Sequence, residues 1–115
     1  MTDIKKMLDT IVKAADGRQA EGITVLDVQE QTTVAEYFVI CSGNSTPQIK
    51  AISGEIEKKL KEQDITPLHI EGYVAANWIL MDYGGIVVHI FHKEMREFYN
   101  LERLWQDSKV IEKRS

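Results

Sequence analysis

The side chains best suited to chemistry in this chain are a single cysteine and three histidines. Cys41 ends the most apolar run of the sequence, where a free cysteine is usually a small core hydrophobe rather than a nucleophile. His89 and His92 stand three residues apart at the end of an expected strand, so we expect their side chains to face opposite ways. His69 has no partner at the spacing of zinc ligands. These residues predict no thiol chemistry, no metal site and no cofactor.

The segment Ser42-Gly43-Asn44-Ser45 lies between a strand-like run and a helical pattern, where a loop can bind phosphate at a helix N-terminus. It lacks the lysine of a P-loop and the three glycines of a dinucleotide fingerprint. A helix cap accounts for the same residues, because serine or threonine before Pro47 suits a helix start. Nucleotidyl transfer would need closely spaced carboxylates for Mg²⁺, and Asp82 is alone on its strand. We therefore expect no catalytic residues and no enzyme activity.

Hydrophobic spacing divides the chain into alternating helical and strand-like segments. A first helix is expected from Ile4 to about Gly17, capped by Thr2 or Asp3. We expect strands over residues 22–28, 37–41, 68–70, 77–82 and 86–91, a second helix from Pro47 to about Gln63, and a third from Lys93 through Trp105. The charged residues 110–115 are expected to fray, as part of a tail over about 107–115. The predicted fold is a single α/β domain over residues 1–115, with a mixed sheet of about five strands flanked by helices.

The last two expected strands form a hairpin around Tyr83-Gly84-Gly85, and its two faces differ. The face expected to meet the core is wholly aliphatic: Ile79, Met81, Ile86, Val88 and Ile90. The other face is mixed: Trp78, Leu80, Asp82, Val87, His89 and Phe91. A second helical layer could cover the mixed face, or the face could be an exposed apolar patch with a polar rim that binds a partner. Asp82 and His89 favour the patch, because each would need a partner if buried.

The composition favours certain kinds of partner and a certain cellular compartment. The chain has 14 Lys and Arg against 18 Asp and Glu, a net charge of −4, which argues against direct nucleic-acid binding and suits a basic protein partner. One cysteine cannot form an internal disulfide, which indicates a reducing compartment. No run of about 18 apolar residues exists and no signal peptide is evident, so we expect a cytoplasmic protein that begins near Met1 and does not enter a membrane.

Two stretches of the sequence resemble a known family. The first contains residues 37–45, Gln48, Glu71-Gly72 and the run Trp-x-Leu-x-Asp-Tyr-Gly at residues 78–84. The second contains residues 88–91 and the ending Arg-x-Phe-Tyr-x-Leu-Glu-x-Leu-Trp at residues 96–105. From the first helix to Trp105 the chain is similar to the ribosomal silencing factor RsfS, the Iojap or YbeB family. It departs from that pattern at Gly85, where an acidic residue is expected, and at Glu36, where an aspartate is expected.

The resemblance implies a fold similar to nucleotidyltransferases, without their catalytic carboxylates. It also implies an activity: binding the large ribosomal subunit through the ribosomal protein numbered fourteen, on the face where the subunits join. The bound factor would sterically block the small subunit and repress translation in stationary phase or nutrient shortage. Proteins of this family are often homodimers, so a homodimer is expected here too.

We expect the mixed hairpin face to be the partner-binding site, with Trp78 and Leu80 as its apolar anchors. The predicted extension of the patch is Val87, His89 and Phe91 with Asp82, and the predicted edge is Arg96, Tyr99 and Asn100. Arg96 could instead be an internal tether to Asp82 or Glu102. Phe98 and Trp105 are expected in the core.

Two other functions fit parts of the same sequence. The chain could be a nucleotidyltransferase-like enzyme with unconventional metal ligands, using the loop from Ser42 to Ser45 for phosphate. It could also be a dimerising adaptor in which the hairpin face is the self-interface. Nucleotide turnover would distinguish the first alternative, and the mass in solution would distinguish the second.

Overall fold

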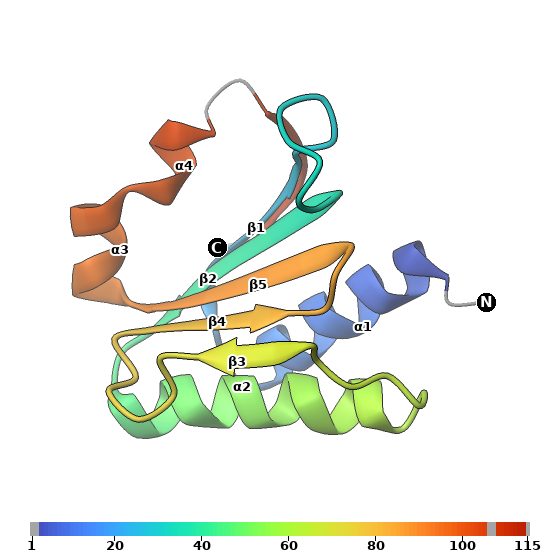
Figure 1. The fold of residues 1–115 in the computed structure, drawn as a ribbon. Coiled ribbons are helices and arrows are strands. Elements are labelled where there is room, and N and C mark those ends of the chain that lie inside the picture. The colour runs from blue at the N-terminus through green and yellow to red at the C-terminus, as the bar shows by residue number, and fades with distance from the viewer. Residues whose placement is uncertain (1–2, 106–107, 115) are drawn as a thin grey trace.

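The structure, a computed structural model, describes residues 3–105 and 108–114. Its strands form one mixed sheet in the order β3-β4-β5-β2-β1-β6 (Figure 1). The strands are β1 (Glu21–Asp27), β2 (Tyr37–Gly43), β3 (His69–Glu71), β4 (Trp78–Asp82), β5 (Ile86–His92) and β6 (Lys109–Arg114). The helices are α1 (Ile4–Gly17), α2 (Thr46–Lys61), α3 (Lys93–Tyr99) and α4 (Leu101–Leu104). The α/β class, the mixed sheet and all five expected strands are confirmed, with strand ends displaced by at most two residues.

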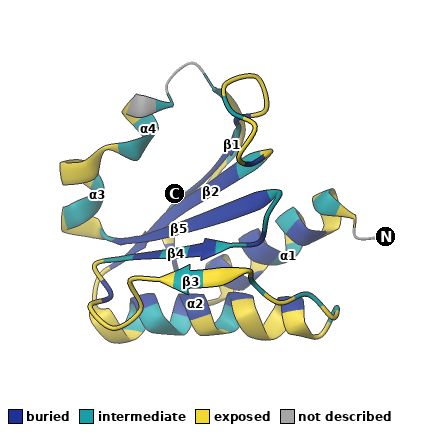
Figure 2. Ribbon diagram, viewed as in Figure 1, coloured by how far each residue is buried: buried dark blue, intermediate teal, exposed yellow. Residues whose placement is uncertain are grey.

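The centre of the sheet is the parallel pair β2 and β5, and every other pairing is antiparallel. Both central strands are buried along almost their whole length, as Figure 2 shows in dark blue. Continuous apolar runs of this kind are expected where a strand is covered on both faces. The β4–β5 hairpin lies beside them, with Trp78 opposite Phe91 and Leu80 opposite His89.

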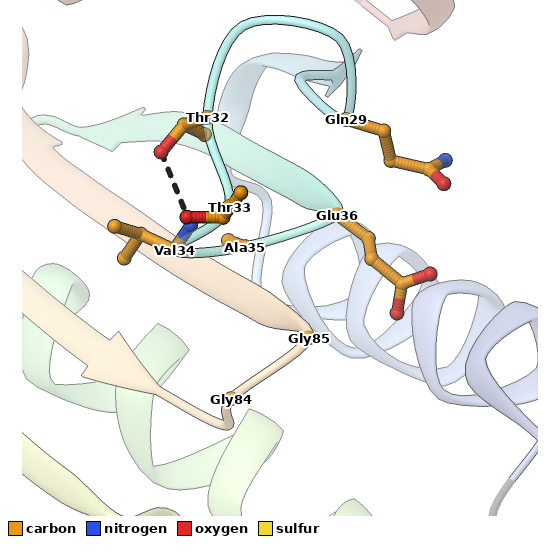
Figure 3. A pocket seen from close by; sticks show the side chains of 8 residues that line it. All are labelled: Gln29, Thr32, Thr33, Val34, Ala35, Glu36, Gly84 and Gly85. Atoms are coloured by element: carbon orange, nitrogen blue, oxygen red, sulfur yellow. Dashed lines mark hydrogen bonds between the residues drawn. The ribbon is translucent and has the colours of Figure 1, made fainter.

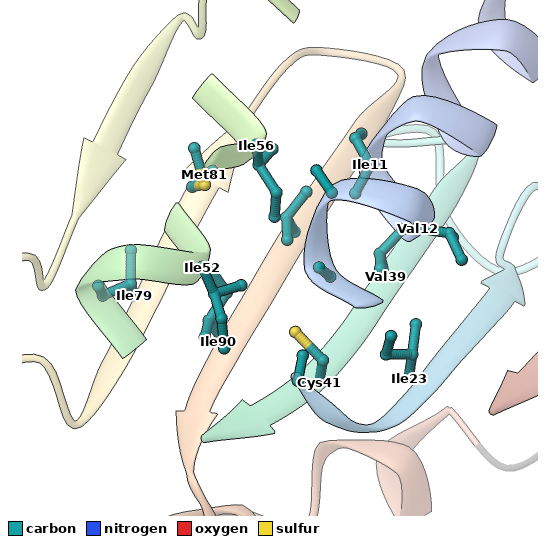
Figure 4. Packing of buried hydrophobic residues seen from close by; sticks show 14 of the residues in the cluster. Ile11, Val12, Ile23, Val39, Cys41, Ile52, Ile56, Ile79, Met81 and Ile90 are labelled. Carbon is teal, nitrogen blue, oxygen red and sulfur yellow. The ribbon is translucent and has the colours of Figure 1, made fainter. Parts of the chain in front are cut away.

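Helices α1 and α2 cover the first face of the sheet, where the main core lies (Figure 4). Ile11 and Val12 from α1 and Ile52 and Ile56 from α2 pack onto the aliphatic hairpin face and its neighbours. The aliphatic face is therefore buried as expected. Both helices begin at side-chain caps: the Asp3 carboxylate accepts from the Lys5 amide at 3.0 Å, and the Ser45 hydroxyl accepts from the Gln48 amide at 3.2 Å. Thr2, the alternative cap, lies outside the described residues.

The second face of the sheet is covered by α3, α4 and Trp105, which we call the arm (residues 93–105). The single helix expected there is wrong. The chain forms two short helices because Asn100 adopts a left-handed conformation, with φ 44° and ψ 52°, which asparagine tolerates better than most residues. In Figure 1 the arm lies on the opposite side of the sheet from α1 and α2.

Two expectations about the chain end and the sheet need correction. The sheet has six strands rather than about five, because residues 109–114 form β6 instead of a frayed tail. They pair antiparallel with β1, whose backbone would otherwise be an open edge. Charged residues flank the exposed pair Val110-Ile111 there, a composition typical of an edge strand rather than of disorder. Residues 107 and 115 of the expected tail lie outside the described residues.

None of the helices within residues 3–105 and 108–114 combines the length and the apolar character that crossing a membrane requires.

The β3–β4 loop generates a prediction about stability. Gly72 has φ +79°, and a Cβ there would overlap the carbonyl oxygen of Trp78. Gly72→Ala should lower the free energy of unfolding by about 1–2 kcal/mol or more, since both backbone strain and the overlap oppose it. Gly54 provides the control, because it is a helical glycine with open space around its Cα and normal helical φ. Gly54→Ala should raise the free energy of unfolding by about 0.5–1 kcal/mol in urea denaturation, and equal effects at the two sites would show that the Gly72 backbone is not strained by a side chain.

Candidate protein-binding site

Trp78 is the first residue of β4, and its indole lies half-buried on the second face of the sheet. Its Nε1 donates a hydrogen bond to Nδ1 of His89 at 3.1 Å. One side of the indole stacks on Phe91, with ring centroids 4.9 Å apart, and the Tyr99 ring of the arm lies 4.8 Å away. The indole is therefore fixed by one hydrogen bond and two aromatic contacts, while part of it remains exposed.

His89 is the polar residue on which this arrangement rests. It is only 5% exposed, and burial lowers the pKa of its imidazole to about 4, so it is neutral at pH 7. Because Nδ1 accepts the Trp78 hydrogen bond, the proton of the neutral ring lies on Nε2. Nε2 has no hydrogen-bond partner among the described residues, and the ring edge contacts Phe38 at a centroid distance of 5.0 Å.

The predicted patch is only partly at the surface. Trp78, Leu80 and Asp82 on β4 are half-exposed, as an exposed patch requires. The expectation that Val87, His89 and Phe91 on β5 are also exposed is wrong, because all three are buried. Val87 and Phe91 belong to a second core on this face of the sheet, with Leu26, Val28, Ala35, Phe38 and Ile40. β5 is central, so the arm and the neighbouring strand β2 cover its side chains, whereas β4 lies nearer the edge of the sheet. Helical cover is therefore confirmed for β5. On β4 the side chains stay partly exposed, and their binding of a partner stays a prediction.

The arm adds aromatic surface beside Trp78. Tyr99 is 42% exposed, as expected for the edge of the site, and Phe98 is 77% exposed, so the expectation that Phe98 is core is wrong. The two rings meet edge to face at 5.3 Å. Phe98 points outward because Tyr99, the next residue on a short helix, faces Trp78, and adjacent helical side chains project about 100° apart. That adjacency in the sequence was the signal that could have identified Phe98 as a surface residue.

Trp105 at the end of the arm is half-buried and packs onto Phe38, with ring centroids 5.0 Å apart. Trp105 was expected in the core, and it packs against the second core with part of its side chain exposed. The aromatic series continues along the sheet from Phe38 to His89, Phe91 and Trp78. The partly exposed end of this series is Trp78 with Tyr99 and Phe98.

The other predicted edge residues have structural roles. Arg96 is an internal tether rather than an edge residue: its side chain is 15% exposed, and Nε lies 2.8 Å from Oε1 of Glu102. The alternative tether to Asp82 is not formed. Asp82 lies at the far end of β4 from Trp78, where its carboxylate accepts from the Gly84 amide at 2.8 Å and stabilises the hairpin turn. Asn100 joins α3 to α4.

The rim of this surface is more acidic than basic. On α3 the exposed charged residues are Lys93, Glu94 and Glu97, which precede the Phe98–Tyr99 pair in the sequence. Aromatic groups with an acidic rim are complementary to a basic protein surface.

A hollow at the opposite end of the hairpin is lined mainly by the loop before β2 and by the β4–β5 turn (Figure 3). A local hydrogen bond stabilises this loop: the Thr32 hydroxyl accepts a hydrogen bond from the Val34 amide at 3.1 Å. The two positions that depart from the family pattern meet here, since the Glu36 amide donates to the Gly85 carbonyl at 2.8 Å. A Cβ at Gly85 would lie 2.7 Å from Ile4 and 3.0 Å from the Glu36 carboxylate, so an acidic residue would be crowded and repelled there.

The side chains that could take part in catalysis or bind a metal ion lie apart from one another. Cys41 is a buried free cysteine in the main core, and burial raises the pKa of its thiol to about 12. The Ser45 hydroxyl is engaged as a helix cap, and His92 caps α3 by accepting from the Glu94 amide at 3.3 Å. Within residues 3–105 and 108–114, no three His, Cys, Asp or Glu side chains are grouped to hold a metal ion.

Comparisons with known proteins agree on one family. A family described as "Ribosomal silencing factor during starvation" (RsfS) matches residues 1–115. A protein from Bacillus subtilis named "Ribosomal silencing factor RsfS" is 43% identical over 108 residues, 94% of this chain and 92% of that protein. A crystal structure from Bacillus halodurans matches with a TM-score of 0.84 and 40% identity, covering 94% of this chain and 98% of that one. A Mus musculus protein named "Mitochondrial assembly of ribosomal large subunit protein 1" is 35% identical over 85% of this chain and 44% of its own length.

The burial of His89 predicts how stability depends on pH. In the unfolded chain a histidine binds a proton below about pH 6.5, whereas folded His89 stays neutral down to about pH 4. Between these values the unfolded state binds more protons, so the free energy of unfolding should fall as pH drops from about 6.5 to 4, by ~3 kcal/mol from this group. In urea denaturation at several pH values, His89→Leu should show a smaller loss over that window.

The control is His69→Gln, which removes an exposed histidine of β3 and should keep the wild-type loss. A His89→Leu profile parallel to the wild-type profile would show that His89 is not the group responsible.

Proposed function

The chain belongs to the RsfS family of ribosomal silencing factors, and we propose that it silences translation by binding the large ribosomal subunit through Trp78 and the aromatic residues beside it. The proposed partner on that subunit is the ribosomal protein numbered fourteen, at the face where the subunits join. Bound there, the protein blocks docking of the small subunit by occupying space. It acts in the cytoplasm without turning over a substrate.

The observation that carries this proposal is the half-exposed Trp78, held by His89, Phe91 and Tyr99. A preorganised aromatic side chain loses little conformational entropy on binding, and tryptophan is among the residues most often found in binding hot spots. The contact surface comprises Trp78, Leu80, Tyr99 and Phe98. The buried Val87, His89 and Phe91 support it from beneath and do not touch the partner.

The charge of this chain and the names of its relatives support the choice of partner. The net charge of −4 and the acidic residues Glu94 and Glu97 beside Phe98 suit a basic surface, and ribosomal proteins must bind RNA. The relative in mouse is named for assembly of the ribosomal large subunit, and the relative in Bacillus subtilis is named a ribosomal silencing factor. The name of the mouse relative favours the large subunit over the small one.

Replacing the central anchor tests the proposal. Trp78→Ala should weaken binding to isolated large subunits by about 2 kcal/mol, roughly thirtyfold, in a sedimentation assay. Val34→Ala is the control, because Val34 is an exposed apolar side chain in the loop before β2, away from this surface. Circular dichroism and the mass in solution should be measured for both variants, so that misfolding or loss of a homodimer is recognised. Wild-type binding by a folded Trp78→Ala protein would refute the anchor.

The small subunit provides the test of the silencing mechanism. Added in excess to large subunits, the wild-type protein should reduce formation of joined ribosomes, whereas Trp78→Ala at the same concentration should not. Binding to the small subunit instead, or unchanged subunit joining when the large subunit is saturated, would overturn the proposal.

Replacing Phe98 gives a second test of the proposal, because a substitution at this exposed residue should hardly affect folding. Since Phe98 is 77% exposed, Phe98→Ala should change the thermal midpoint little, yet it should weaken large-subunit binding by about 1 kcal/mol or more, roughly fivefold. Ile111→Ala on β6 removes an exposed aliphatic side chain from the far edge of the sheet and should leave binding unchanged. Equal affinities for the two variants would exclude Phe98 from the surface.

A further inference from the structure

The second face of the sheet has a polar end that hydrophobic packing does not account for. Thr24 of β1 and Ser42 of β2 are buried, and by strand alternation they share this face with Leu26, Phe38 and Ile40. A buried hydroxyl needs a hydrogen-bond partner. These two lie where the β1–β2 register shifts, between Glu21 and Thr24.

Arg96 of the arm fills this polar end. Its Nη1 donates to the Glu21 carbonyl at 3.3 Å and to the Ser42 hydroxyl at 3.4 Å, and its Nη2 donates to the Thr24 hydroxyl at 3.4 Å. Gly22, with φ +57°, makes the approach possible, because a Cβ there would lie 2.7 Å from Nη1. The register shift, the glycine and the two hydroxyls thus form a seat for one guanidinium group.

Glu102 completes the arrangement from the other half of the arm. Its carboxylate accepts from Nε at 2.8 Å and from Nη2 at 3.1 Å, the paired geometry that arginine forms with carboxylates. Arg96 lies on α3 and Glu102 on α4, so the pair links the helices across the break at Asn100. The ion pair also balances the positive charge that Arg96 places against the sheet.

The arm has few other attachments. No residue of α3 is buried. The arm meets the second core through the partly buried Leu101 and Trp105, and through Tyr99, whose ring lies 6.1 Å from Phe91. Along the sequence, Tyr99, which packs against Trp78, lies between Arg96 and the apolar residues Leu101 and Trp105. The position of Tyr99 therefore depends on what holds α3 to the sheet, and Arg96 makes the polar contacts that do so.

We propose that Arg96 and Glu102 are positioning residues for the partner-binding surface. Arg96, seated on Thr24, Ser42 and the Glu21 carbonyl and paired with Glu102, holds the arm so that Tyr99 lies against Trp78 and Phe98 against Tyr99. This inference rests on the proposed function, and it assigns affinity for the ribosomal partner to two residues that do not touch it.

The test uses the full chain with Arg96→Gln and Glu102→Gln, and Arg103→Gln as the control on the exposed side of α4. Hydrogen exchange followed by mass spectrometry should show faster exchange over residues 93–105 in the first two variants, with the sheet unchanged. Affinity for large subunits should fall about tenfold or more for Arg96→Gln and somewhat less for Glu102→Gln. Arg103→Gln should match the wild type in both measurements. Arg96→Lys should not restore full affinity, because an ammonium cannot make the paired contacts.

The outcomes separate this inference from the proposed function. Unchanged exchange over residues 93–105 would overturn the positioning role whatever the ribosome does. Faster exchange with wild-type affinity would show that the position of the arm does not govern binding, and would overturn it too. If the wild-type protein binds no ribosomal subunit, the proposed function fails, while exchange in the variants still decides whether Arg96 positions the arm. Should Arg96→Gln unfold, Glu102→Gln, a near-isosteric change at a half-exposed side chain, decides by the same two measurements.

Discussion

The two central strands, β2 and β5, carry apolar side chains on both faces, so the sheet needs a covering layer on each side. The first layer is extensive, because α1 and α2 each place a row of aliphatic residues on the sheet. For the second layer the described residues supply the short arm, together with Val28 and Ala35 from the loop before β2. The arm reaches β5 but leaves β4 half-exposed, so the boundary of its cover lies at Trp78. The candidate binding surface is where the second layer ends.

At that boundary a buried polar side chain orients an aromatic one. Beneath it His89 is kept neutral by burial and accepts the hydrogen bond of the Trp78 indole. A group used in this way stabilises the orientation of an anchor. Neutral His89 can be buried with one ring nitrogen unpaired at less cost than a charged imidazolium. The aromatic surface above it gains rigidity from these buried contacts, which is what a site that acts by occupancy requires.

Local patterns predicted much of this molecule. Alternation placed the aliphatic side of the hairpin against the main core, and the serine before Pro47 correctly marked the start of α2. The Trp-x-Leu-x-Asp-Tyr-Gly run and the aromatic ending identified the family that the comparisons show. The edge strand β6 was missed, since charged residues near a chain end look the same whether or not β1 is available to pair with them.

The sequence by itself determined which side chains share a face, because alternation along a strand is a property of neighbouring residues. It also determined the helix caps and the family. Only the tertiary structure decided which of those faces are covered: His89 and Phe91 became buried, Phe98 became exposed and Arg96 turned inward to Glu102. The physical reason is that burial depends on what packs from elsewhere in the chain. For the mixed hairpin face that is an arm whose position depends on contacts with β1 and β2, more than fifty residues away.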